Sequence, residues 1–204
     1  MACIPSATGE IVAGLPIVQA MIDNGDGTYS STYSFTGGAG TKVSLSAELV
    51  GQNGIWVEYF NNMEMLGTPD KAVWEYQDLN YDWGSGLVTT SQAENVSVRW
   101  WGKLMAPQSG DFTFTIEHDS AFALYIDDVL MTDAWYFNGP QTTTFTMKMT
   151  KNRVYDYRQE FADDSGTSFA KVQWESRKVK LEYIPTTDLY MIERVGGTHN
   201  VVLI

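Results

Sequence analysis

The chain has 204 residues, of which 44% are hydrophobic and 13% are aromatic, enough to build a substantial core. The 25 acidic residues outnumber the 13 basic ones and give a formal net charge of −12. Because the basic residues are few and form no cluster that could bind a phosphate backbone, nucleic acid is excluded as a partner. The single cysteine excludes an intrachain disulfide, and no stretch of about 18 apolar residues is present to form a transmembrane helix.

A glycine-rich turn is the first clear structural signal in chain order. Residues 23–29 read Asp-Asn-Gly-Asp-Gly-Thr-Tyr, and apolar or aromatic residues then alternate with polar ones as far as Phe35. This arrangement predicts a tight turn that leads into a β-strand. The acidic spacing lacks the final glutamate of an EF-hand, so a calcium loop is not favoured here.

Period-two alternation dominates the centre of the chain, from residue 95 to residue 128. Apolar side chains occupy every second position, and Pro107, Ser109 and Gly110 interrupt the alternation. The pattern predicts half-buried antiparallel strands joined by tight turns. Helical periodicity is weak throughout, so we expect an all-β protein. The alternating positions are Val96, Val98, Trp100, Phe112, Phe114, Ile116, Phe122, Leu124 and Ile126.

The same region resembles the PA14 domain family. The segments that carry the resemblance follow one another in the family's order, and they are 57–60 (VEYF), 82–84 (DWG), 97–100 (SVRW), 102–114 (GKLMAPQSGDFTF), 124–127 (LYID), 154–157 (VYDY), 171–176 (KVQWES) and 184–190. The resemblance implies an antiparallel β-sandwich over residues 54–190. It also implies a module of the kind found in extracellular toxins, adhesins and glycosidases.

The two flanks do not match the PA14 pattern. The turn at 23–29 resembles a strand signature of filamin-type immunoglobulin repeats, and residues 195–204, a glycine pair followed by an apolar run, resemble the last strand of such a repeat. Together the resemblances imply a PA14-like sandwich inserted into an incomplete filamin- or immunoglobulin-like sandwich made of residues 1–50 and 191–204. Surface loops tolerate such insertions at small entropic cost, and an incomplete sandwich has exposed edges that recruit partners.

A calcium site is the first candidate that the PA14 resemblance implies. In the sugar-binding members two adjacent aspartates, joined by a cis peptide, hold a calcium ion that chelates sugar hydroxyls, and the matching positions here are His118 and Asp119. An imidazole removes both a charge and a hard oxygen ligand. Asp119 is therefore left as the one acidic ligand of a weakened Ca²⁺ site, or as an acceptor for a sugar hydroxyl. The alternative is that Asp119 only caps its turn, with His118 as a solvated loop residue.

Aromatic residues in loops are the second candidate for sugar binding. Trp83, Trp135 and Tyr136 lie in or beside glycine-containing loops, where flat rings can stack on pyranose rings, and Asn138 can add a hydrogen bond. We predict these residues, with Asp119, as the carbohydrate-binding site.

Other aromatic residues fall at alternating strand positions and are expected in the core. They are Trp56, Trp100, Phe114 and Trp174. Trp101 adjoins Trp100, and successive strand residues point to opposite faces, so one of the two should be buried and the other exposed.

Two functions remain open, and neither is catalytic. The sequence has two histidines, one cysteine and no recognisable nucleophile, zinc-protease, phosphate-loop or dinucleotide motif. The first function is carbohydrate recognition or adhesion, with a glycan as partner. The second is a structural subunit whose terminal edge strands complete the sheets of neighbouring subunits, which gives a homo-oligomer or filament. Both imply an extracellular or cell-surface location, although the first residues lack the pattern of a signal peptide.

Overall fold

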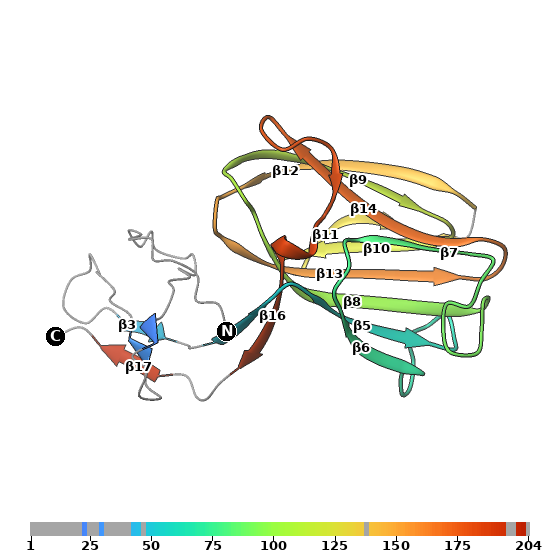
Figure 1. Cartoon of the computed structure of the whole chain (residues 1–204), viewed down its shortest axis with the longest axis horizontal. Coiled ribbons are helices and arrows are strands. Elements are labelled where there is room, and N and C mark those ends of the chain that lie inside the picture. Colours follow the sequence, from blue (N-terminus) through green and yellow to red (C-terminus); the bar gives the residue numbers. More distant parts are fainter. Residues whose placement is uncertain are drawn as a thin grey trace. The chain divides into compact units, whose positions relative to one another are not determined.

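The computed structural model describes the backbone of residues 22–23, 29–30, 42–45, 48–136, 139–194 and 199–202, and the side chains of residues 53–136 and 139–190. The chain divides into two compact units. Unit 1 comprises Met1–Gly51 and Ile192–Ile204, and unit 2 comprises Gln52–Met191. Unit 2 therefore lies, in sequence, between the two segments of unit 1 (Figure 1).

The larger sheet of unit 2 is antiparallel, with the strand order β6-β5-β8-β13-β10-β11. β16 pairs with β8 beside β5. The eighth described strand of this sheet is β4, which belongs to unit 1 except for Gln52. The strands are β4 (Glu48–Gln52), β5 (Ile55–Phe60), β6 (Lys71–Glu75), β8 (Val96–Met105), β10 (Ala121–Ile126), β11 (Val129–Ala134), β13 (Val154–Asp163) and β16 (Leu189–Arg194).

The smaller sheet is also antiparallel, with the order β12-β9-β14, and both β7 and β15 pair with the other edge of β14. Its strands are β7 (Asn80–Gly84), β9 (Gly110–His118), β12 (Gln141–Met149), β14 (Ser168–Ser176) and β15 (Glu182–Tyr183). Figure 1 shows the two sheets as facing layers. The prediction of an all-β antiparallel sandwich is thus confirmed.

The core lies between the two sheets and is made by the alternating residues. In β9 every second side chain from Phe112 to Ile116 is buried, and the intervening side chains are partly exposed. Trp174 of β14 packs against Phe112 and Phe114, with ring centroids 5.0 Å and 6.1 Å away. Burial of aromatic side chains of this size supplies much of the driving force for such a sandwich.

Adjacent tryptophans of β8 point to opposite faces, as predicted. Trp100 is fully buried, whereas Trp101 is 43% exposed. The expectation that Trp56 belongs to the core is wrong, because Ile55 and Val57 take the inward positions of β5. Trp56 lies instead on the outer face, where its ring packs edge-on against Trp101 at 6.3 Å.

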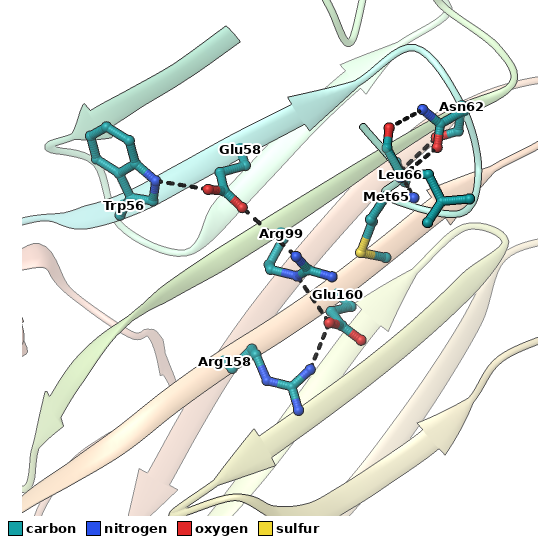
Figure 2. A network of polar contacts seen from close by, with 9 residues as sticks. Trp56, Glu58, Asn62, Met65, Leu66, Arg99, Arg158 and Glu160 are labelled. Carbon is teal, nitrogen blue, oxygen red and sulfur yellow. Dashed lines mark hydrogen bonds and ion pairs between the residues drawn. The ribbon is translucent and has the colours of Figure 1, made fainter. Parts of the chain in front are cut away.

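An ion-pair network crosses the outer face of the larger sheet (Figure 2). Arg99 of β8 lies between Glu58 of β5 and Glu160 of β13, at 3.8 Å and 3.1 Å. Arg158 also contacts Glu160, at 2.6 Å, and the Trp56 indole N–H donates to Glu58. These paired charges link three neighbouring strands.

The two ends of unit 2 are held together by hydrogen bonds. The backbone N–H groups of Asn53 and Gly54 donate to the carbonyl oxygen of Leu189, at 3.1 Å and 3.3 Å. Shortly before Leu189 the chain forms the 3-10 helix η1 (Thr186–Asp188). In the part of the chain that the structure describes, no helix has the length and apolar character needed to cross a membrane.

Unit 1 contributes two described strand pairs. β1 (Ile22–Asp23) pairs with β2 (Tyr29–Ser30), and β3 (Lys42–Leu45) pairs with β17 (His199–Val202), both antiparallel. These pairs do not establish an immunoglobulin-like sandwich. The filamin- or immunoglobulin-like host for unit 2 therefore stays a prediction.

Candidate functional site

The turn between β9 and β10 crosses from the smaller sheet to the larger one. It consists of Asp119 and Ser120, and Ser120 adopts a left-handed conformation with φ of 67°. The Asp119 N–H donates to the carbonyl oxygen of Phe169 in β14, at 3.1 Å. The turn is therefore fixed to the neighbouring strand at one end of the sandwich.

His118 precedes this turn and is fully buried, so the expectation of a solvated histidine is wrong. Its ring stacks on Phe122, with centroids 5.3 Å apart, and its Nδ1 lies 2.9 Å from the carbonyl oxygen of Ser120. Burial lowers the pKa of His118 because the charged imidazolium loses its hydration. Its Nε2 atom is buried and has no hydrogen-bond partner among the described residues.

Asp119 is 4% exposed and ties its turn to the connection between β13 and β14. Its Oδ2 accepts a hydrogen bond from the Thr167 hydroxyl, at 2.7 Å. A Cβ atom placed on Gly139 would lie 4.0 Å from the other carboxylate oxygen of Asp119. The loop between β11 and β12 therefore runs beside this carboxylate.

Two further carboxylates lie close to the turn. The buried Asp163 accepts a hydrogen bond from the Ser168 hydroxyl at 2.9 Å, and Asp164 accepts one from Ser120 at 3.3 Å. Burial, with a smaller contribution from the charges of Asp119 and Asp164, raises the pKa of Asp163 to about 6 even though hydrogen bonds from Ser168 and Ser120 lower it. The second carboxylate oxygen of Asp163 has no partner among the described groups.

These residues do not fit a calcium ion. One carboxylate oxygen of Asp119 already accepts a hydrogen bond from Thr167, and the Nδ1 of His118 lies beside the carbonyl oxygen of Ser120. Within the described residues, no group of three or more histidine, cysteine, aspartate or glutamate side chains could hold a metal, and no peptide bond is cis. Ca²⁺ needs six to eight oxygen ligands, which this constellation does not supply.

Trp135 and Tyr136 lie in the loop between β11 and β12, and they are 39% and 43% exposed. The loop leaves β11 at Ala134, which pairs with Phe122, and enters β12 at Gln141, which pairs with His118. It therefore spans the end of the sandwich across the turn that holds Asp119. Asn138, the other predicted site residue of this loop, lies outside the described residues.

Trp83 has a different environment from the other predicted site residues. It lies in β7 and is partly buried, and its ring stacks on Phe161 at 5.7 Å and tilts against Trp100 at 6.2 Å. It also lines a surface pocket of about 410 Å³ together with Tyr59, Glu75, Tyr76, Gln77 and Tyr81. Apart from Trp83, the sequence reasoning missed this pocket, because it is formed by strands of different sheets.

The comparisons with known proteins agree on the fold of unit 2. The family model described as PA14 domain matches residues 51–188. The anti-sigma-I factor RsgI3 of Acetivibrio thermocellus is 29% identical over 139 residues, which are 68% of this chain and 21% of that protein. This chain therefore spans about a fifth of that curated relative.

Solved structures give the same result. An anti-sigma factor domain-containing protein is 28% identical with a TM-score of 0.65, and the match covers 69% of this chain and 48% of the other. The PA14 sugar-binding domain from an RTX adhesin has a TM-score of 0.57 at 14% identity, over 69% of this chain and 99% of that domain. The second likeness shows a shared fold.

Proposed function

Because the chain belongs to the PA14 domain family, we propose that it is a non-enzymatic carbohydrate-binding module. The observation that carries the proposal is the exposure of Trp135 and Tyr136 in the loop that spans the turn of Asp119. Exposed aromatic rings offer flat apolar faces to sugar rings, and loops at the end of a rigid sandwich are common binding sites. The adhesin domain of the same fold is described as sugar-binding.

Within this site we assign different roles to the loop and to the turn. Trp135 and Tyr136 contact the sugar, and Asn138 adds a hydrogen bond. Asp119 is almost fully buried and accepts a hydrogen bond from Thr167, so we assign it a supporting role that fixes the turn beside the loop. Since the described residues do not fit Ca²⁺, sugar binding at this site is independent of the ion.

A glycan array probed with the full chain, with and without a chelator, tests the proposal. We expect binding to a subset of glycans, unchanged by the chelator. The double substitution Trp135→Ala and Tyr136→Ala should weaken it about tenfold or more, because the stacking faces are lost. Trp101→Ala is the matched control, since Trp101 is similarly exposed but lies in β8. An array without signal, or equal loss in the control, contradicts the proposal.

The relatives suggest a context for this binding. Two of the matched proteins are named as an anti-sigma-I factor and as an anti-sigma factor domain-containing protein. We therefore propose that sugar recognition is the input of a longer regulatory protein, at the cell surface or outside the cell, with a sigma factor as its eventual target. Deleting the coding region for residues 52–191 should abolish the transcriptional response to the glycan found on the array. An unchanged response contradicts this role.

A further inference from the structure

A polar and aromatic pocket lies between the edge strands β6 and β7 of the two sheets. β6 is the edge strand of the larger sheet, and β7 pairs only with β14 among the described strands of the smaller sheet. The pocket of about 410 Å³ is lined from these strands, from β5 and from residues 76 and 77. We propose that it binds one residue of a neutral sugar, at a site separate from the loop of Trp135 and Tyr136.

The polar centre of this pocket is the carboxylate of Glu75, which is held by three donors. Its Oε1 accepts hydrogen bonds from the Tyr59 hydroxyl, at 2.7 Å, and from the Lys71 ammonium, at 3.4 Å. Its Oε2 accepts one from the Gln77 side-chain amide, at 3.2 Å. The carboxylate is therefore oriented before a ligand arrives, and a carboxylate oxygen can accept a further hydrogen bond from a sugar hydroxyl.

Tyr81 also lines the pocket. Tyr81 is 3% exposed, and its hydroxyl makes no hydrogen bond to the described residues. Burial, together with the charge of Glu75, strongly raises the pKa of Tyr81, so the hydroxyl stays protonated. Because this hydroxyl is itself buried, Tyr81 forms part of the pocket lining, and the contacts with the sugar hydroxyls are assigned to Glu75 and Gln77.

Aromatic rings form the walls of the pocket. Tyr76 is 67% exposed, and its ring lies against Gly54, where an added Cβ would come within 3.3 Å of the ring atoms. Glycine thus allows the Tyr76 ring to lie close to the backbone. Trp83 is held by its stacking on Phe161. Two positioned rings beside a carboxylate and an amide are suited to a ligand with both apolar faces and hydroxyl groups.

Charge selects a neutral ligand over an ionic one. The Lys71 ammonium lies 4.8 Å from the centre of the Tyr59 ring and also pairs with Glu75, so a cation of the protein already occupies these positions. An anionic ligand would meet the Glu75 carboxylate and a chain of net charge −12. A neutral pyranose satisfies the polar groups without adding charge.

Calorimetric titration of the full chain carrying Trp135→Ala and Tyr136→Ala tests the pocket alone. The probes are cellohexaose, xylohexaose, mannohexaose and galacto-oligosaccharide, with choline as a cationic probe. We expect at least one neutral probe to bind with a Kd of about 1 mM or tighter, and choline not to bind. Adding Tyr76→Ala should weaken binding about tenfold, and Tyr76→Phe should preserve it because the ring remains.

A second variant and a control make the test decisive. Glu75→Gln keeps the shape of the side chain but removes its charge, and it should also weaken binding of the neutral probe. Trp101→Ala should leave the affinity unchanged. The proposal is overturned if no neutral probe binds, if Tyr76→Ala binds as tightly as its parent, or if choline binds instead. Because the loop rings are absent throughout, failure here leaves the array result for the loop site intact, and success does not depend on it.

Discussion

Buried ionisable side chains are concentrated around the turn between β9 and β10, where their environment sets their charge. Asp163 has a pKa raised from 3.8 to about 6, so the folded protein binds this proton more tightly than the unfolded chain. The contribution of Asp163 to stability therefore falls as the pH rises from about 4 to above 6. At neutral pH a buried carboxylate with one unpartnered oxygen destabilises the fold.

Replacing Asp163 by asparagine should therefore stabilise the protein at neutral pH. The amide can still accept the hydrogen bond from Ser168, and the buried charge is removed. We expect a gain of about 2 kcal/mol in the free energy of unfolding at pH 7.5 and almost none at pH 4. Urea unfolding of parent and variant at both pH values measures this difference.

The comparison between parent and variant is necessary because His118 acts in the opposite direction. Its lowered pKa means that the unfolded chain binds the proton more tightly, so this group loses stability as the pH falls through about 6.5. A gain for Asp163→Asn that is equal at pH 4 and pH 7.5 would contradict the prediction, because it would mean that folding does not raise the pKa of this carboxyl.

The environment of His118 also shows what local sequence cannot predict. Loop signals around residues 118–120 correctly placed a turn, but burial depends on Phe122 and Ser120, which the crossing between sheets brings around the ring. Asp119 was proposed as a site residue from its resemblance to the PA14 pattern, not from local sequence. Its contact with Thr167, 48 residues later in the chain, had no local signal.

At the scale of strands, alternation is informative where one face is polar. It correctly placed Phe112 and Phe114 in the core, and it required one exposed tryptophan beside Trp100. It failed for Trp56, because apolar residues occupy both faces of β5 and the period does not say which face is buried. The pocket at Glu75 was missed for another reason, since it joins edges of two sheets that no sequence period relates.

The two faces of β8 give a matched prediction for stability. Trp100→Ala removes a fully buried ring and should cost about 3–5 kcal/mol of unfolding free energy. Trp101→Ala removes a neighbouring ring that is 43% exposed and should cost about 1 kcal/mol. Denaturant melts of both variants measure the two losses. Equal losses would mean that the outer face of the sheet is covered in solution.

At the scale of the whole molecule, the strand pairing of unit 1 bears on assembly. β17 pairs with β3 of the same chain, so the C-terminal strand has a partner without a neighbouring molecule. We therefore expect the full chain to remain monomeric in sedimentation experiments over a roughly hundredfold range of concentration. Growth of oligomers with concentration would favour the structural-subunit function.

The described hydrophobic core, from Ile55 to Leu189, lies entirely within unit 2. The Asn53 and Gly54 amides donate hydrogen bonds to the Leu189 carbonyl, so the chain enters and leaves unit 2 at neighbouring positions. Because its two ends are close together, such a segment can be inserted into an exposed hairpin of a fluorescent or enzymatic reporter without separating the strands of that hairpin. Residues 52–191 are therefore suited to transfer, as one folded domain, between unrelated host proteins.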